Sequence, residues 1–389
     1  MTRTAWVLGA ALALVLLPSN LPAAALPLLG AEWSASSAAL GWVVSAYQLG
    51  YTAAVPILLP LTDRVSAPRI VAASAAVTAI ASALFPLLAH DAVVGSLLRV
   101  VAGMGLAGIY MPGVRLVAAS ARPERRGFAI GAYVAAFYLG TALSFLVAGL
   151  LLPLGWRMAG LLITLPALLA LPLAFASAAP TLEAGDRGRL DPRVLRDPPL
   201  ARTVFAYAAH AWELFVSRTW TAAFLAAALV SSGLELADAS ASASLWASVA
   251  FAIAIPAVFL GGWWSDRVGR DRAAIVLAAT SGVLSLAIGF LLEAPFAALM
   301  LLVCVHAAFI GSDSAVYSTA VTELSPRGRL GSAQAVQALA GFGMGAVGPV
   351  VAGAALDVGL SWPGVFATGG VLSLLGAAAL AYGRRSRAE

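Results

Sequence analysis

Few ionisable side chains interrupt the long apolar stretches of this sequence, and they are the residues best placed to do chemistry. A charge held in hydrocarbon costs roughly 2.5–3.5 kcal/mol even on a lenient scale, so each one needs a partner or a function. No phosphate-binding loop, nucleophile elbow or paired metal-ligand spacing accompanies them, so we expect neither an enzyme nor a metal site. The set comprises Arg99, Arg115, His210, Glu213, Arg218, His306 and Asp313.

The densest group of polar residues lies between Tyr207 and Trp220. Glu213 and Arg218 are five residues apart, about 140° around a helix, so they cannot pair well within it. His210 lies three residues before Glu213, where the two side chains can touch. Loss of water favours the protonated form of a carboxylate, which makes Glu213 the leading proton-carrier candidate. A static ion pair with an arginine on another helix is the alternative.

The other acid and the arginines also leave alternatives. Asp313 is expected either to pair with Arg115 or to take part in proton coupling. Arg99 and Arg218 would suit a carboxylate or an inorganic oxyanion, although Arg99 can instead hold the fold. Further pocket candidates are His210, His306, Asn20, Tyr47, Gln48, Tyr207, Trp212, Trp220 and Tyr317, although histidines and tryptophans in spans more often serve packing.

The composition places these residues in a membrane protein. Of 389 residues, 61% are hydrophobic and 11% are charged, whereas ordinary soluble domains are about 25% charged. The net charge of +5 comes from arginines at the ends of apolar segments, which argues for membrane topology and against a nucleic-acid partner. The single cysteine, Cys304, excludes an intrachain disulfide.

Twelve apolar stretches are each long enough to cross about 30 Å of hydrocarbon, and lipid leaves the helix as their only structure. The first is too long for the apolar region of a cleaved signal peptide. The breaks at 90–92 and 293–294 are the weakest. We therefore predict an all-α integral membrane protein with spans at 5–29, 39–61, 69–89, 93–119, 127–152, 157–178, 201–231, 242–264, 273–292, 295–321, 332–356 and 361–382.

The one long polar connection divides these helices six and six. It predicts bundles at 1–178 and 201–389 joined by a linker at 179–200. Nineteen of the 23 arginines then lie on one side and only Arg157 on the other, so both termini are expected in the cytoplasm. Leu-Thr-Asp-Arg-Val at 61–65 matches Trp-Ser-Asp-Arg-Val at 264–268, an offset of 203 residues that indicates a duplicated six-helix unit.

Across the whole chain, this arrangement resembles the major facilitator superfamily of secondary transporters. The sharpest match is Gly-Trp-Trp-Ser-Asp-Arg-Val-Gly-Arg-Asp-Arg at 262–272, which is similar to the family's loop signature Gly-x-Leu-x-Asp-Arg-x-Gly-Arg-Arg/Lys. The first-half copy lacks both glycines. The resemblance implies a conformational latch, the plainer alternative being that the arginines only mark the inner face. The latch residues would be Asp63, Arg64, Gly262, Asp266, Arg267, Gly269 and Arg270.

Two further features bear on the resemblance. Residues 99–105 are similar to the Arg-x-x-x-Gly-x-Gly pattern of the family's fourth helix. The fifth helix lacks the glycine–proline signature of the drug antiporters. In the superfamily, helices 1, 4, 7 and 10 line a central cavity, and all the charges within spans of this chain fall on helices 4, 7 and 10. The resemblance implies two pseudo-symmetric six-helix bundles that transport by alternating access.

We therefore expect a monomeric secondary transporter in a bacterial-type cytoplasmic (inner) membrane, with a small-molecule substrate, the lipid bilayer as partner and no cofactor beyond the proton gradient. An organic or inorganic anion leads as substrate, and residues 207–220 are loosely similar to nitrate/nitrite- and cyanate-type permeases. Efflux of drugs or amphiphiles by proton antiport is the alternative. A non-transporting membrane sensor is the candidate from another class, although it would need an added signalling domain.

Overall fold

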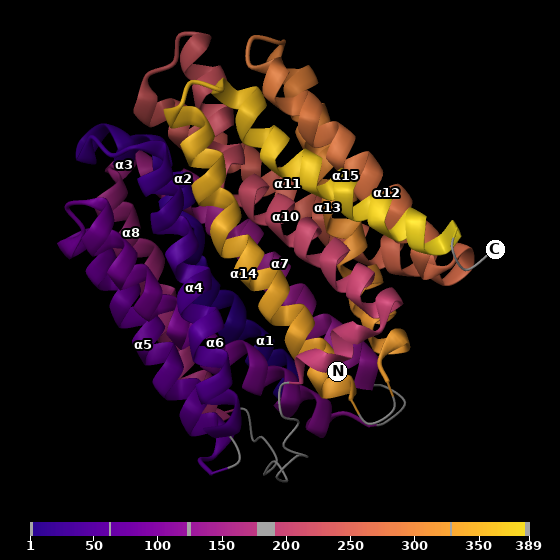
Figure 1. Ribbon diagram of the computed structural model, residues 1–389. Helices are drawn as coiled ribbons and strands as arrows, with labels where there is room; N and C mark the ends of the chain where they lie inside the picture. Colours follow the sequence, from indigo (N-terminus) through magenta and orange to yellow (C-terminus); the bar gives the residue numbers. More distant parts are fainter. Residues whose placement is uncertain (1–2, 62–63, 123–125, 177–190, 327–328, 386–389) are drawn as a thin grey trace. The chain divides into compact units, whose positions relative to one another are not determined.

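The computed structural model describes residues 3–61, 64–122, 126–176, 191–326 and 329–385, and the described residues are almost entirely helical (Figure 1). No strand occurs among them. The predicted all-α membrane fold is confirmed. Among the described residues, eleven helical segments are long and apolar enough to cross a membrane. The 25-residue helix α4 (Ser37–Leu61), where the second span was expected, is not one of these eleven.

The first half of the chain contains five long helical segments in addition to α4. The first span is interrupted, and the sixth is built from two short α-helices and a 3₁₀ turn. The elements are α1 (Arg3–Leu16), η1 (Leu17–Asn20), α2 (Leu21–Ala24), α3 (Leu26–Trp33), α4 (Ser37–Leu61), α5 (Ala67–Leu88), α6 (Ala92–Ser120), α7 (Arg126–Leu151), η3 (Leu152–Leu154), α8 (Trp156–Thr164), η4 (Leu165–Leu169) and α9 (Ala170–Ala176).

The second half begins with a 3₁₀ turn and continues in six long helices. These elements are η5 (Pro192–Arg196), α10 (Pro198–Ser231), α11 (Leu236–Val268), α12 (Arg270–Ile288), η6 (Gly289–Leu291), α13 (Phe296–Leu324), α14 (Leu330–Asp357) and α15 (Ser361–Arg385).

Both of the weak breaks between predicted spans are real ends of helices. Asp91 precedes α6, and its carboxylate accepts a hydrogen bond from the Val94 N–H at 2.8 Å. Such an N-cap satisfies a backbone donor that a helix leaves unpaired at its start. Pro295 precedes α13, and proline favours the beginning of a helix because it has no N–H to leave unpaired. The two polar breaks therefore end one helix and start another.

Contacts between residues divide the chain into two compact units. Unit 1 comprises 1–35, 42–187 and 233–248, and unit 2 comprises 36–41, 188–232 and 249–389. The main division falls inside the predicted linker 179–200, of which 177–190 lies outside the described residues. The start of α4 belongs to unit 2 and the start of α11 to unit 1, whereas the prediction placed α4 wholly in the first bundle and α11 wholly in the second.

Hydrogen bonds explain the assignment of these first turns. In unit 2, the Asp357 carboxylate accepts hydrogen bonds from the backbone N–H groups of Ser37 and Ala38 at 2.7 and 2.9 Å. In unit 1, the Ser244 hydroxyl donates to the carbonyl of Phe145 at 2.7 Å. Each contact satisfies a backbone group and ties the start of one long helix to its unit.

The described end of the predicted linker belongs to the core of unit 2. The Asp191 carboxylate caps η5 through the Arg193 N–H and lies 3.2 Å from Arg329. Val194 is buried against Leu200 and Val204 of α10. The turn that precedes α10 is therefore held by an apolar contact and an ion pair.

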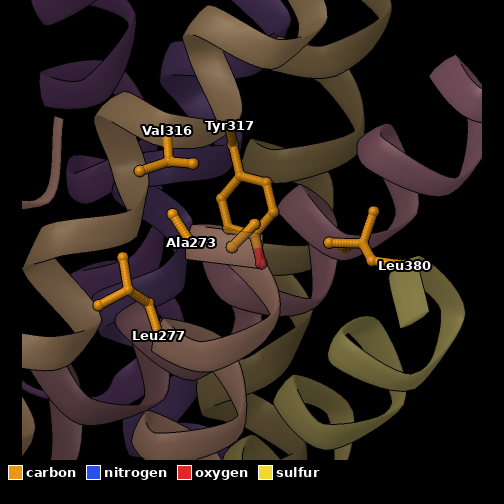
Figure 2. Packing of buried hydrophobic residues seen from close by; sticks show 7 residues of the cluster. Ala273, Leu277, Val316, Tyr317 and Leu380 are labelled. Carbon is orange, nitrogen blue, oxygen red and sulfur yellow. The ribbon is translucent and has the colours of Figure 1, made fainter. Parts of the chain in front are cut away.

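A second apolar cluster lies between α10, α12, α13 and α15. It contains Ala273, Leu277, Val316, Tyr317 and Leu380, all of them buried. Figure 2 shows the ring of Tyr317 among these side chains, with its hydroxyl directed into the cluster. The hydroxyl has no hydrogen-bond partner, which costs free energy in a buried position.

Candidate functional site

Arg99 of α6 lies in unit 1 against the interruption of the first span. Prolines at the starts of η1 and α2 cannot donate the hydrogen bonds of a continuous helix. Three carbonyls at this break are met by side chains: Ser19 Oγ donates to Leu16 at 2.6 Å, and Ser144 Oγ donates to Leu17 at 2.5 Å. The third is Ser19 O, which accepts a hydrogen bond from the Arg99 guanidinium at 2.7 Å.

The rest of the Arg99 side chain is also enclosed in unit 1. Its guanidinium carbon lies 4.3 Å from the centre of the Tyr47 ring, and 4% of the residue is exposed. A cavity of about 10 Å³, too small for a solute, lies beside Arg99 and Ser82. Nε of Arg99 and Oγ of Ser82 have no hydrogen-bond partner. This environment favours the fold-holding interpretation of Arg99 over anion binding.

The glycines that follow Arg99 explain the fourth-helix pattern. A Cβ at Gly103 would collide with the backbone of Tyr47 in α4, and one at Gly105 would collide with Thr78 in α5. Thr78 also donates a hydrogen bond to the carbonyl of Ala102 at 3.1 Å. The pattern therefore lets three helices of unit 1 approach closely.

The remaining pocket candidates of unit 1 lie near the same break. Asn20 is 7% exposed, and its backbone N–H donates to Ser144 Oγ at 3.0 Å. Gln48 is 9% exposed, and its carbonyl accepts a hydrogen bond from Thr52 at 2.8 Å. Arg115 is half-buried further along α6. The structure thus gathers Asn20, Tyr47 and Arg99 around the interrupted first span.

Glu213 of α10 lies in the interior of unit 2 and has two polar partners. Its Oε1 accepts a hydrogen bond from Ser281 of α12 at 2.8 Å and lies 3.0 Å from Nε2 of His306 in α13. Glu213 and His306 are 1% and 2% exposed. Gly369 of α15 packs against the aliphatic part of Glu213, where a Cβ would crowd the side chain. The carboxylate is thus enclosed by four helices.

A second carboxylate–imidazole pair joins the same two helices. Nδ1 of His210 lies 2.9 Å from Oδ1 of Asp313, and these side chains are 2% and 1% exposed. The two atoms are at ion-pair distance but are not aligned for a hydrogen bond. The other ring nitrogen of His210 lies 3.1 Å from the Ser314 hydroxyl. Tyr207 and Tyr317 surround the imidazole, with ring centres 6.0 and 5.6 Å away.

These pairings differ from the contacts considered from the sequence, and the roles of the residues stay predictions. His210 and Glu213 can touch within a helix, but each pairs with a residue of α13. Asp313 pairs with His210 of its own unit, whereas a pair with Arg115 was one of the two alternatives considered. The described ion-pair partner of Glu213 is a histidine, whereas the alternative considered was an arginine. Helical spacing shows which residues share a face, while the rotation of neighbouring helices decides which of them meet.

The aromatic side chains of α10 mostly pack on α14. Ideal Cβ atoms at Gly341 and Gly345 would overlap the rings of Tyr207 and Phe215. Gly348 similarly faces Trp212. The glycines of the eleventh predicted span therefore make room for large rings, and these two helices lie side by side (Figure 1).

The last polar candidates of α10 lie near its middle. Trp220 is 2% exposed, and its indole N–H donates to the carbonyl of Pro349 at 3.0 Å. Arg218 is 8% exposed, with its guanidinium carbon 5.2 Å from the centre of the Phe215 ring. Both residues lie in unit 2 with the two carboxylate–imidazole pairs.

The second-half loop signature forms a network at the ends of α11, α12 and α13. Arg270 pairs with Asp266 one turn earlier and with Glu323 at 3.2 Å, and it donates to the Ser265 hydroxyl at 2.6 Å. Gly269 has a φ of 92°, a conformation that favours glycine. This geometry explains why the signature places a glycine between its acidic and basic residues.

The other predicted latch residues are less connected. Arg267 stacks over the Trp263 ring at 3.7 Å, and Gly262 is half-buried. Arg64 is exposed in unit 1, and Asp63 lies outside the described residues. The described contacts of the second-half signature stay within unit 2, so its role as a latch stays a prediction.

Sequence reasoning missed the partners of the candidate residues. Glu323 lies two residues beyond the end of the tenth predicted span, so it was not counted among the charges within spans. Ser281 gave no signal, because serines in apolar helices are common. A third network was also missed: Arg157 donates to Glu32 and to the carbonyl of Pro86 at 2.6 and 2.7 Å. The available signal was that Arg157 is the one arginine predicted for the outer loops.

Comparisons with known sequences agree with this architecture. The family model of the Major Facilitator Superfamily matches residues 8–237 and again 234–389. A protein described as "Probable transporter SCO4007" of Streptomyces coelicolor is 31% identical over 367 residues, covering 92% of this chain and 82% of its own length. "Uncharacterized transporter YgaY" of Escherichia coli O157:H7 is 33% identical over 131 residues, 32% of each chain.

Solved structures share the fold at low sequence identity. A bacterial homologue of the human lysosomal transporter Spinster, in an inward-facing and occupied conformation, has a TM-score of 0.75 at 16% identity and covers 98% of this chain and 96% of its own. A variant of the nucleoside transporter NupG has a TM-score of 0.74 at 14% identity and covers 98% and 99%. Since the family model covers nearly the whole chain and a transporter relative aligns along most of it, this protein belongs to the Major Facilitator Superfamily and is a multi-pass membrane transporter.

Proposed function

We propose that this transporter couples movement of a small anion to protons that bind at the two carboxylate–imidazole pairs of unit 2. The observation behind the proposal is that Glu213–His306 and His210–Asp313 join the same two helices, α10 and α13. Ionisable groups are rare in membrane spans, and those present are functional by default.

The chemistry of these pairs suits proton exchange. A carboxylate and a neutral imidazole that share one additional proton form a neutral pair, whether that proton lies on the nitrogen or on the oxygen. A second added proton leaves the pair with a charge of +1. In an enclosed site of low dielectric this change is costly, and it alters the attraction between the groups. Protonation of Glu213 would therefore loosen its contact with His306 and with it the packing of α10 on α13.

For the anion itself, Arg218 is the better candidate of the two arginines first considered. Arg99 lies in unit 1, where it donates to the carbonyl of Ser19. Arg218 lies on α10 five residues beyond Glu213, within the same unit as both pairs. A guanidinium binds carboxylates and oxyanions through several parallel hydrogen bonds. We expect substrate and proton to act on the same helix.

The topology belongs to the same proposal. The asymmetry of the arginines supports an arrangement in which both termini, and the loop signature at 262–272, face the cytoplasm. In a bacterial cytoplasmic membrane, the proton gradient would then drive protons towards that side. The anion would enter with them as a symported solute.

The test measures uptake by the full-length protein in proteoliposomes. Nitrate and small carboxylates are offered with and without an imposed pH gradient, and exchange is followed separately under equal concentrations. We expect gradient-driven accumulation that a protonophore abolishes. Glu213→Gln should lose accumulation but retain exchange, because the amide still accepts a hydrogen bond from Ser281 but no longer takes up a proton.

Glu235→Gln is the matched control, since Glu235 is exposed and the substitution removes the same charge. It should behave as the unmodified protein does. Undiminished uphill transport by Glu213→Gln would exclude the coupling role of Glu213. Transport of amphiphilic cations in place of the anions would instead favour proton-driven efflux.

A further inference from the structure

A cavity of about 290 Å³ lies at one end of unit 2, where four long helices begin or end. Its lining includes Gly269 and Arg272 from the start of α12, Glu323 from the end of α13 and Arg384 from the end of α15. It is separate from the carboxylate–imidazole pairs, none of which contributes to the lining. The cavity is large enough for the polar head of a lipid but belongs to no part of the transport site described above.

The lining contains three arginines and two acidic residues, Asp271 and Glu323, so its net charge is positive and favours an anion. Arg270 is engaged by Asp266 and Glu323. Arg272 and Arg384 are exposed, and within the described ranges neither has an ion-pair or hydrogen-bond partner. Two guanidinium groups without partners thus share one concave surface. Planar guanidinium groups match the oxygens of a phosphate through paired hydrogen bonds.

The position of the cavity indicates where such a phosphate would come from. Helix α11 exposes Phe259, Leu260 and Trp263, which are 57%, 63% and 54% exposed and form an apolar surface on its last turns. Trp263 stacks on Arg267, the type of aromatic and basic pairing found where a span meets the lipid headgroups. On α15, Tyr382 is 69% exposed two residues before Arg384. Both helices therefore reach the membrane surface at the level of the cavity.

We propose that this cavity binds the phosphate of an anionic phospholipid headgroup between Arg272 and Arg384. The four spans place the cavity at headgroup depth, and the guanidinium groups supply the recognition. Gly269 leaves the floor open, because no heavy atom lies within 4 Å of the position a Cβ would take. The bound lipid would bridge α12 and α15 beside the Arg270–Glu323 contact. This site is independent of proton coupling.

The experiment measures lipid binding to the full-length protein in detergent by native mass spectrometry. Short-chain phosphatidylglycerol is titrated against the unmodified protein and against an Arg272→Gln/Arg384→Gln double variant. Each basic residue near a membrane surface contributes about 1 kcal/mol to anionic-lipid binding, so the double variant should bind roughly thirtyfold more weakly. Arg193→Gln/Arg196→Gln, which removes two exposed arginines of η5, has the same charge change and should bind within about twofold of the unmodified protein.

Two further arms distinguish the chemistry and its source. Short-chain phosphatidylcholine, whose trimethylammonium group the arginines repel, should bind more weakly than phosphatidylglycerol. Glycerol 3-phosphate should compete poorly, because it lacks the chains that the apolar surface of α11 would hold. Equal binding of phosphatidylglycerol by both double variants would overturn the site, and equal binding of glycerol 3-phosphate would overturn the lipid assignment. Thermal unfolding without lipid tests whether both variants are folded.

Discussion

Replacement of Arg99 by methionine separates its two predicted roles, because one affects folding and the other affects substrate binding. The guanidinium donates a hydrogen bond of 2.7 Å to the carbonyl of Ser19 and lies over the Tyr47 ring. A hydrogen bond from a charged group contributes about 1.5–3 kcal/mol, and a desolvated cation–π contact contributes about 0.5–2 kcal/mol. Methionine fills the volume of the aliphatic stem and removes the cost of burying a charge. We expect a net loss of about 3 kcal/mol in unfolding free energy.

The assay is equilibrium unfolding in mixed micelles, combined with transport kinetics in proteoliposomes. Tyr47→Phe is the matched control, because it keeps the ring under Arg99 and removes a buried hydroxyl that has no hydrogen-bond partner. Its stability should equal or exceed that of the unmodified protein by up to about 1 kcal/mol. Tyr47→Leu removes the ring, so combining it with Arg99→Met in a double-mutant cycle should give a coupling of about 0.5–2 kcal/mol.

A different pattern would refute this reasoning. If Arg99→Met unfolds within about 0.5 kcal/mol of the unmodified protein while the KM for an anion rises, Arg99 binds substrate and the carbonyl of Ser19 does not need it. If the variant is destabilised as expected, activity per folded molecule should change little. The ratio of active to folded protein therefore decides between the two roles.

Three other substitutions follow from the structure. Tyr317→Phe removes a buried hydroxyl without a partner and should raise the unfolding free energy by about 1 kcal/mol in denaturant titrations; a decrease would reveal a partner. Gly345→Ala should cost about 1–3 kcal/mol, because the new Cβ meets an aromatic ring of α10, whereas Gly343→Ala, with open space around it, should cost far less. Partial burial opposes ionisation of the Glu32 carboxyl, but hydrogen bonds from Trp156 and Arg157 outweigh it and lower its pKa. The ionised Glu32 carboxylate therefore stabilises the fold above the pKa that Glu32 has in the unfolded chain, and this stabilisation is lost as the pH falls through the lower pKa of the folded state. The unfolding free energy of Glu32→Gln should accordingly differ from that of the unmodified protein near neutral pH and approach it in acid.

The helices were largely predictable because a helix that is surrounded by lipid must be apolar along its length. Each predicted span corresponds to a helix or a run of short helices in the structure. The first span was predicted as continuous at 5–29, but it breaks at Leu17 because prolines remove backbone donors there. The sequence contains those prolines. It does not indicate which side chains satisfy the freed carbonyls, since Ser144 comes from more than 120 positions away.

The candidate residues were predictable, whereas their partners were not. Buried charges stand out in an apolar sequence, so Glu213, His210, His306 and Asp313 could all be named. Their pairing depends on how α10 and α13 are rotated about their axes, which no spacing within one helix specifies. The same limitation applies to Arg99, whose main partner is a backbone carbonyl. Every residue has a backbone carbonyl, so the sequence does not indicate which one accepts a hydrogen bond from Arg99.

The two halves of the sequence repeat carry different residues at equivalent positions of α6 and α13. At the 203-residue offset, His306 and Asp313 of α13 correspond to Gly103 and Tyr110 of α6. Gly103 gives α6 a close approach to α4, while Nε2 of His306 lies 3.0 Å from the Glu213 carboxylate. Arg99, buried in unit 1, donates to a backbone carbonyl, whereas Glu213 and Asp313, buried in unit 2, each lie beside a histidine. Under the proposed coupling, proton-dependent movement should therefore arise in unit 2.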